Sequence, residues 1–187
     1  MKYSLIITYR DRKKHLSQLL PVLQKKFMNH DYEIIISEQD DKKKFRKNDL
    51  YNIAVREYAT GDVLVFHDVD YVPDDSVTYE IKDQPEMWEE IGGLNPLYVG
   101  WGLEDDDTRQ RVRAWGYEWF RPEPEVGTFF VLPHDDNHPG IDDESYLKNV
   151  EIAKDFENKL KYGYKDSKGV VEKFETNNEN LIWLKIR

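Results

Sequence analysis

Residues 61–70 read Gly-Asp-Val-Leu-Val-Phe-His-Asp-Val-Asp, a short apolar run that ends in two acidic residues separated by one residue. Val63–Phe66 consists of branched and aromatic residues, as in a buried strand, and the Gly-Asp pair before it is typical of a turn. Open parallel sheets bind ligands beyond the carboxyl ends of their strands. If this strand belongs to such a sheet, Asp68 and Asp70 are expected at a ligand-binding edge.

The chain before this strand alternates between strand and helix patterns. Residues 3–8 and 32–37 are apolar and rich in strand-forming residues, whereas residues 15–27 and 50–58 carry apolar side chains at helical spacing. The alternation predicts an α/β fold in which a mostly parallel central sheet is flanked by helices. The loops after all three strands would then share one edge of the sheet.

The second part of the chain has a looser pattern. It predicts strands near residues 76–81, 117–121, 128–132 and 181–186, and helices near residues 85–91, 104–115 and 143–160.

Composition limits the classes of function. The chain has 187 residues, of which 39% are hydrophobic, so it has the size of one domain. Its formal charge of −10 argues against nucleic acid or an anionic membrane as partner. No stretch approaches the roughly 20 apolar residues of a membrane span, and the first apolar run is too short for a signal sequence, so a cytoplasmic location is expected. Cysteine is absent, so a metal ion would be held by oxygen or imidazole ligands, which suits Mn²⁺ or Mg²⁺.

The Asp68-Val-Asp70 pair can place one carboxylate on a divalent metal ion while the other reaches a ribose hydroxyl or the metal's water shell. Taken alone, such a pair is also typical of an ordinary solvated turn. Residues 133–138, Pro-His-Asp-Asp-Asn-His, follow a predicted strand and offer His134 and His138 as further ligands. Histidine in an acidic loop is, however, often unliganded.

Residues 100–107, Gly-Trp-Gly-Leu-Glu-Asp-Asp-Asp, place four consecutive acidic residues at the start of a predicted helix. A structural explanation exists, because acidic residues in a first helical turn stabilise the helix by roughly 0.3–1 kcal/mol each. Four in succession exceed that need, and crowding of carboxylates can raise one pKa enough for general base catalysis. We therefore expect part of a functional site here.

Two basic and aromatic clusters, Tyr9-Arg-Asp-Arg12 and Phe45-Arg-Lys47, follow strands in a chain that is otherwise acidic. Their aromatic rings can stack on a nucleobase, and the planar guanidinium groups suit phosphate oxygens. Each cluster by itself is also compatible with an ordinary solvated surface.

In their order along nearly the whole chain, these features resemble the β-1,4-galactosyltransferase family, whose members adopt the GT-A nucleotide-sugar-binding fold. The Tyr9–Arg12 cluster stands where the family has Phe-Arg-x-Arg, and residues 32–39 match its second strand and the Gln that ends it. The remaining matches are Phe45-Arg-Lys-Asn-Asp-Leu-Tyr-Asn52 with Phe-Asn-Arg-x-x-Leu-x-Asn, Asp68-Val-Asp70, residues 100–107 with Gly-Trp-Gly-Gly-Glu-Asp-Asp-Asp, and Arg121-Pro122.

The resemblance implies a single GT-A-like domain of residues 1–187 with a nucleotide-binding half, residues 1–75, and an acceptor-binding and metal-completing half, residues 76–187. It implies an inverting, metal-dependent transferase that moves a hexose or N-acetylhexosamine, of galactose type, from a UDP-sugar to a glycan or glycoside hydroxyl. No partner protein is expected. The donor site would comprise Tyr9, Arg10, Arg12, Phe45, Lys47, Asp68, Val69 and Trp101.

The resemblance also divides the chemistry among the acidic residues. Asp70 would bind Mn²⁺ or Mg²⁺ together with His134, which is favoured over His138 because it follows the predicted strand more closely. Asp105 would be the general base, and the acceptor sugar would be held by Trp101, Gly102, Glu104 and Asp106.

Three departures from the family pattern bear on these roles. Val131 stands where the family usually has a Met metal ligand, three residues before His134. The segment from Pro73 to Met87 is much shorter than in the family, so the donor sugar does not follow from the resemblance. Leu103 replaces a Gly or a polar residue.

Two other functions remain open at this point. A catalytically silent nucleotide-sugar or glycan-binding module would fit the missing Met and the shortened segment. A metal-dependent phosphohydrolase would need carboxylates that bridge two metal ions, so the fold would have to bring the clusters at residues 68–70 and 104–107 within about 4 Å of a metal pair.

Overall fold

The main sheet of the computed structural model is mixed but mostly parallel. Residues 1–79, 87–118, 125, 127–133, 143–155, 157 and 160–187 are described. The strand order is β3-β1-β2-β7-β6, with the bounds β3 Val63–Asp68, β1 Lys2–Tyr9, β2 Asp31–Gln39, β7 Leu181–Ile186 and β6 Val171–Phe174. β1 pairs in parallel with β2 and β3, and β2 with β7, whereas β6 is antiparallel to β7. The predicted α/β fold is confirmed.

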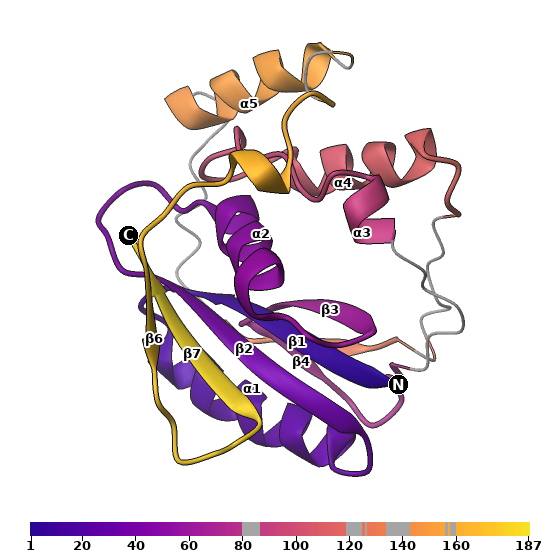
Figure 1. Ribbon diagram of the computed structural model, residues 1–187, viewed down its shortest axis with the longest axis vertical. Helices are drawn as coiled ribbons and strands as arrows, with labels where there is room; N and C mark the ends of the chain where they lie inside the picture. Colours follow the sequence, from indigo (N-terminus) through magenta and orange to yellow (C-terminus); the bar gives the residue numbers. More distant parts are fainter. Residues whose placement is uncertain (80–86, 119–124, 126, 134–142, 156, 158–159) are drawn as a thin grey trace.

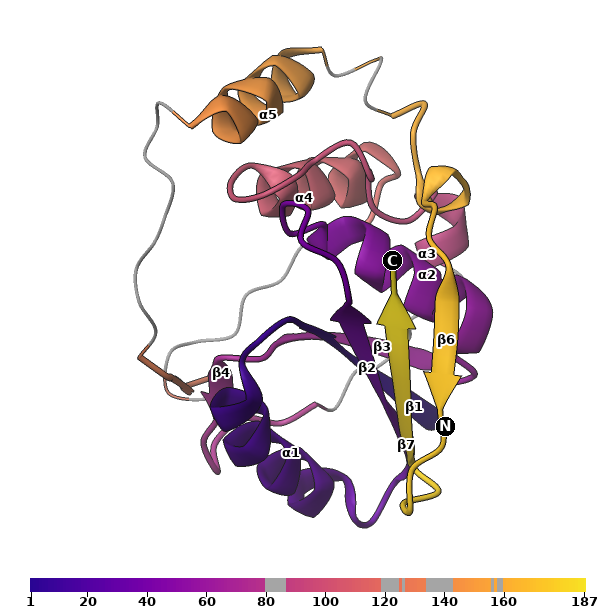
Figure 2. The same cartoon turned by 90° about the vertical axis from the view of Figure 1, so that its left-hand side faces the viewer.

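The sheet separates two hydrophobic cores because successive side chains of a strand point to opposite faces. Leu5 and Ile7 of β1 pack in the core under α1 (Lys13–Phe27), and Ile6 between them packs in the core under α2 (Lys47–Tyr58). All three are fully buried. Figure 1 and Figure 2 accordingly show α1 on one face of the sheet and α2 on the other.

The remaining helices lie on the α2 side of the sheet, and the two views agree on this (Figure 1, Figure 2). They are α3 (Met87–Glu90), α4 (Glu104–Ala114), α5 (Glu144–Lys154) and the short 3-10 helix η2 (Tyr164–Asp166). A second, two-stranded antiparallel sheet joins β4 (Tyr71–Pro73) to β5 (Phe129–Val131). None of the helices in the described ranges has the length and apolar character needed to cross a membrane.

The strand predicted near residues 76–81 is wrong in its described part. Residues 76–79 form no strand, and the strand of this region is β4, directly after the acidic pair. The reason is local, because the Asp74 side chain accepts hydrogen bonds from the backbone N–H and the hydroxyl of Ser76. Such a bond closes a turn and ends the extended conformation.

The strand predicted at 117–121 is also absent from the residues that can be compared. Tyr117 and Glu118 are not in a strand, and residues 119–121 lie outside the described residues. Gly116, at φ 84°, ends α4, and the Tyr117 N–H returns to the carbonyl of Val112. This is the usual way for a glycine to stop a helix. The helix predicted from residue 143 to 160 is shorter, and β6 was not predicted.

Candidate active site

The three parallel strands β1, β2 and β3 end level with one another. Thr8 of β1 pairs with Ser37 of β2 and with Asp68 of β3. The segments that follow these strands, together with loops near α4 and α5, enclose a cavity of about 700 Å³. Its lining consists of Thr8, Arg10, Arg12, Lys44, Phe45, Lys47, Asp68, Val69, Asp70, Tyr71, Gly100, Trp101, Glu104, Asp105, Val131, Asp143 and Ser145.

Most of the residues predicted from the sequence meet in this cavity, but Tyr9, Gly102 and Asp106 do not line it. The Tyr9 ring is 6% exposed and packs edge-on against Trp183, so it belongs to the hydrophobic core. Gly102 and Asp106 lie next to lining residues without reaching the cavity. His134 lies outside the described residues, as do His138 and Arg121-Pro122.

The segment after β2 is folded back by Gln39, the last residue of that strand. Its amide nitrogen donates to the carbonyls of Lys43 and Lys44, both at 3.1 Å, and its carbonyl accepts from the backbone N–H of Arg46 at 2.9 Å. Gln39 is 2% exposed, so these bonds form in a water-poor environment. The consequence is a fixed loop that presents Lys44 and Phe45 to the cavity.

Arg10 and Phe45 meet at one side of the cavity. The Arg10 guanidinium lies over the Phe45 ring, 5.3 Å from its centre, and Arg10 also donates to the carbonyl of Lys43 at 2.6 Å. A flat cation stacked on a ring forms a surface that suits a planar, electron-rich group such as a nucleobase.

The Asp68-Val-Asp70 segment supplies the carboxylates at the strand ends. Asp70 is 8% exposed, and its Oδ2 atom accepts from Arg12 Nη1 at 2.9 Å. Oxygen donors of this kind fit Mn²⁺ or Mg²⁺. Within the described ranges, however, no cluster of three or more His, Cys, Asp and Glu side chains could hold a metal ion. Asp70 is therefore suited to be one ligand of a metal site, not the whole of it.

Lys47 connects the strand-end carboxylates with those of α4. Its ammonium nitrogen lies 3.2 Å from an oxygen of Asp68, 3.3 Å from one of Asp105 and 3.8 Å from one of Glu104. Burial alone would lower the pKa of Lys47, but Tyr51 and these carboxylates outweigh that effect and raise its pKa. Lys47 therefore stays charged and holds the acidic groups of two distant segments together.

The four acidic residues at the start of α4 have different environments. The Asp105 side chain is 81% exposed and faces the cavity, whereas that of Glu104 is 13% exposed. Burial, followed by the charge of Asp105, raises the pKa of Glu104. Asp106 pairs with Arg109 on the surface, and Asp107 is buried beside Arg111. The structure thus directs Glu104 and Asp105 to the cavity and uses Asp107 within the fold.

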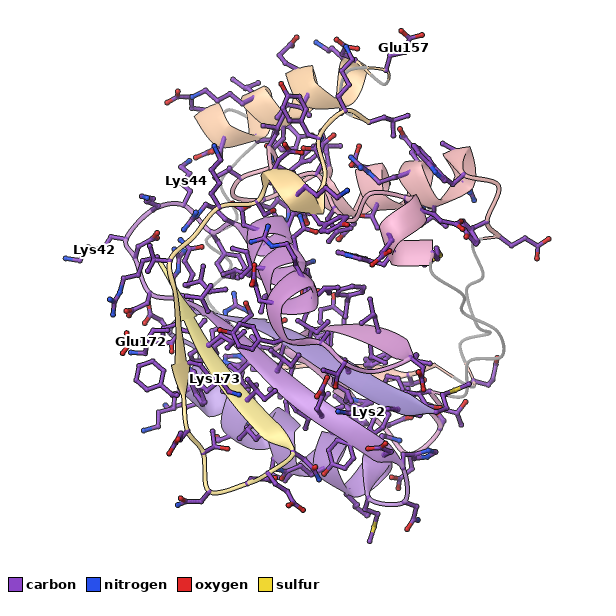
Figure 3. All side chains as sticks on the ribbon, in the orientation of Figure 1. Lys2, Lys42, Lys44, Glu157, Glu172 and Lys173 are labelled. Atoms are coloured by element: carbon purple, nitrogen blue, oxygen red, sulfur yellow. The ribbon has the colours of Figure 1, made fainter. Side chains whose placement is uncertain are left out.

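Several lining residues were missed by the sequence reasoning, among them Lys44, Asp143 and Ser145. Lys44 donates to both oxygens of Asp143, at 2.7 and 2.9 Å, and to the hydroxyl of Ser145 at 3.1 Å. In Figure 3 the labelled Lys44 lies beside α5, which begins at these residues. The only sequence signal was the helix-capping pattern of Asp143 and Ser145, which does not identify a partner about 100 residues away.

Sequence profiles of one family match the larger part of the chain. Residues 1–82 match the N-terminal region of glycosyl transferase group 7, and residues 84–135 match the N-terminal domain of galactosyltransferase. β-1,4-Galactosyltransferase 4 of Mus musculus is 32% identical over 169 residues, 71% of this chain and 48% of the relative. For β-1,4-galactosyltransferase 6 of Homo sapiens the identity is 28%, over 71% of this chain and 44% of the relative. The chain therefore spans about half the length of these relatives.

Two solved structures share the fold. The catalytic domain of Drosophila β-1,4-galactosyltransferase 7 in complex with xylobiose superposes with a TM-score of 0.78 at 24% identity, over 99% of this chain and 93% of that one. A mutant of the Drosophila enzyme in complex with manganese, UDP-Gal and xylobiose gives a TM-score of 0.80 at 22% identity, with the same coverage of 99% and 93%. The family profiles, the relatives and the shared fold all agree with the motifs at the cavity. The chain therefore belongs to the β-1,4-galactosyltransferase family, glycosyl transferase group 7.

Proposed function

We propose that this chain is a metal-dependent, inverting glycosyltransferase. It transfers a hexose or N-acetylhexosamine, of galactose type, from a UDP-sugar to a hydroxyl group of a glycan or glycoside acceptor. One observation carries the proposal: a cation-aromatic pair, the Asp68-Val-Asp70 carboxylates and the acidic start of α4 all line a single cavity. The family membership supports this assignment, and the Drosophila relative was crystallised with manganese, UDP-Gal and xylobiose.

The donor would bind along the strand ends. The stacked Arg10 and Phe45 suit the uracil ring, and the ammonium of Lys47 and the guanidinium of Arg12 suit the diphosphate. The cavity of about 700 Å³ is within the range of roughly 300–1,000 Å³ that small-molecule sites occupy. Asp68 would contact the ribose or the sugar.

A divalent metal ion, when bound, neutralises negative charge that develops on a leaving diphosphate. Asp70 would be a ligand of Mn²⁺ or Mg²⁺, with His134 as the second predicted ligand. Because Asp70 is paired with Arg12, a metal ion would share or replace that contact. The chemistry of an oxygen donor set fits either ion.

Asp105 would accept the proton of the acceptor hydroxyl. Its side chain is well exposed at the cavity, where a substrate can reach it, and Glu104 and Trp101 lie beside it. As the proton moves to Asp105, the acceptor oxygen forms a bond to the anomeric carbon and the bond from that carbon to UDP breaks. An in-line attack of this kind inverts the configuration at the sugar carbon without a covalent enzyme intermediate.

The test is the release of UDP from UDP-galactose, with Mn²⁺, in the presence of a panel of β-glycoside acceptors. We expect UDP release that requires both the acceptor and the metal ion, and a β-linked product from the α-linked donor. A protein that binds UDP but neither transfers the sugar to any acceptor nor hydrolyses the donor would contradict the proposal and favour a silent binding module. Product with retained configuration would contradict the inverting mechanism.

The cytoplasmic location and the division into two functional halves stay predictions. Fractionation of the source cells would test the location.

A further inference from the structure

Residues 99–103, here called the Trp101 loop, lead directly into α4 and the predicted catalytic residues. Three of the five residues have positive φ angles: Gly100 at 78°, Gly102 at 102° and Leu103 at 71°. Residues other than glycine rarely adopt positive φ angles, so the backbone conformation of Leu103 requires support from its surroundings.

The Gly100 N–H donates to the carbonyl of Phe45 at 2.7 Å. Further support comes from the side chain of Asn149 in α5. Its amide oxygen accepts from the backbone N–H of Val99 at 3.2 Å. Its amide nitrogen donates to the carbonyls of Gly102 at 3.0 Å, Val99 at 3.2 Å and Trp101 at 3.4 Å. Asn149 is 2% exposed, so its bonds are shielded from water.

The loop and α5 pack closely against each other. A Cβ atom on Gly100 would lie 2.7 Å from the Ser145 hydroxyl, and one on Gly102 would lie 2.8 Å from the Tyr146 ring. The Trp101 ring itself stacks on Tyr146, with 5.6 Å between ring centres. The close approach of loop and helix depends on the two glycines, and the Asn149 amide joins the two elements by hydrogen bonds.

We propose that Asn149 is a positioning residue: it fixes the backbone of the Trp101 loop and thereby places Trp101, Glu104 and Asp105 at the cavity. Asn149 does not itself line the cavity, so it acts through the loop and not on the substrate. The expected effect of Asn149 on turnover rests on the proposed transferase function. The expected effect of Asn149 on the position of Trp101 does not depend on that function.

The test variants are Asn149→Asp and Asn149→Leu. The carboxylate of the first variant keeps the acceptor for the Val99 N–H, but it loses both N–H donors and turns a negative charge toward three carbonyl oxygens. The second has the same branched arrangement of four side-chain heavy atoms and makes no hydrogen bonds, so it remains informative if the charged variant does not fold.

Asn52→Asp is the matched control. Asn52 is also a fully buried asparagine that holds a loop, because it donates to the carbonyl of Leu94 at 2.7 Å and accepts from the Leu94 N–H at 2.9 Å. That loop does not line the cavity but adjoins Gly93, which packs against Trp88. The control thus carries the same substitution, with a comparable loss of buried hydrogen bonds, at a residue that does not line the cavity.

The deciding measurement is ¹⁹F NMR of protein labelled with 5-fluorotryptophan, with the Trp101 signal assigned through Trp101→Phe. We expect both Asn149 variants to shift or broaden the Trp101 signal while the Trp183 signal stays in place. Asn52→Asp should instead perturb the Trp88 signal and leave that of Trp101 unchanged. An unchanged Trp101 signal in folded Asn149→Asp and Asn149→Leu would overturn the proposal.

Kinetics provide a second readout that a loss of stability alone would not give. For the Asn149 variants, kcat/KM for the acceptor should fall by roughly 10- to 100-fold, with UDP affinity within about twofold of the wild type. The Asn52 variant should keep its kcat/KM despite a lower Tm. An equal loss of kcat/KM in Asn149→Asp and Asn52→Asp would overturn the positioning role. A wild type that transfers to no acceptor would overturn the proposed function alone, since the NMR comparison needs no turnover.

Discussion

The cavity has two sides that are held in place by different kinds of interaction. The strand-end side, with Arg10, Arg12 and the Asp68–Asp70 segment, continues directly from β1 and β3. The loop side, with Trp101, Glu104 and Asp105, belongs to the Trp101 loop and the start of α4. Ladder hydrogen bonds and two hydrophobic cores fix the first side, whereas side-chain bonds to backbone groups fix the second.

This difference predicts how each side responds to substitution. Many backbone bonds together hold the strand-end side, so a change at its surface should affect binding without moving the backbone. On the loop side a few buried polar side chains make several bonds each. Their loss should shift catalytic groups or destabilise the fold, because an unsatisfied buried polar group is unfavourable.

The largest effect is expected from Asp105→Asn on the loop side. The asparagine has nearly the same shape but cannot take up a proton, so turnover should fall by roughly 10²–10⁴-fold, measured as UDP release. Glu57→Gln, at an exposed surface pair with Arg56, is the control and should leave turnover unchanged. Near-normal turnover of Asp105→Asn would remove it as the base and direct attention to Glu104.

A large loss of stability is expected from Arg111→Met, a substitution in the buried part of α4. Arg111 is 1% exposed, donates to the carbonyls of Ile91 and Tyr162 at 3.2 and 2.8 Å, and lies 3.7 Å from buried Asp107. Removing the buried cation should lower the free energy of unfolding by about 3–5 kcal/mol in urea titrations. Arg109→Met removes an exposed pair and should lower it by at most about 1 kcal/mol. Similar losses in both variants would show that the buried pair has no special role.

A smaller, pH-dependent effect is expected at the opposite end of the sheet. Burial would raise the pKa of Glu33, but hydrogen bonds from Ser4, Lys2 and Thr60 outweigh it and lower the pKa. A lowered carboxyl pKa contributes stability above the pKa of the unfolded chain, and this is lost as the pH falls through the folded-state value. The Tm advantage of wild type over Glu33→Gln should therefore shrink as the pH falls below about 4. A difference in Tm that stays constant with pH would contradict this.

The smallest effect is expected from Leu103→Gly in the Trp101 loop. Glycine adopts the positive φ of 71° without strain, but it loses more backbone entropy on folding, so the net gain should be about 0.5 kcal/mol. Gly102→Ala is the opposite test, since its Cβ would lie 2.8 Å from the Tyr146 ring, and it should lower the Tm. A destabilised Leu103→Gly would indicate that the leucine side chain contributes packing that outweighs the backbone strain.

The same contrast explains what could be predicted from the sequence. Apolar runs predict the strands of the parallel sheet, and helical spacing predicts the helices between them. The residues at the strand ends follow from these strands, as Val63–Asp68 and the following Asp70 illustrate. The match of the acidic motif to a known family added Glu104 and Asp105. Predicting the strand ends and the acidic motif did not require knowing which side chains from distant parts of the sequence contact one another.

The parts that the sequence did not reveal depend on such distant contacts. Lys44 stood in a lysine-rich stretch that gave no sign of its bonds to Asp143, and Asn149 is one of several polar residues in its helix. Tyr9 was expected at the nucleotide, but it is buried against Trp183, a residue of the last strand. Periodicity locates an element and its buried face, whereas these positions depend on how separate elements meet.

The most direct test is isothermal titration of UDP with Mn²⁺ into Asp70→Asn and Asp105→Asn, compared with wild type. If the strand-end side binds the donor and the loop side acts on the acceptor, Asp70→Asn should lose metal-dependent UDP binding while Asp105→Asn retains the wild-type affinity. Equal affinity in all three proteins would contradict the role of Asp70. Loss of binding in Asp105→Asn would show that the acidic start of α4 belongs to the donor site, and the division between the two sides would be wrong.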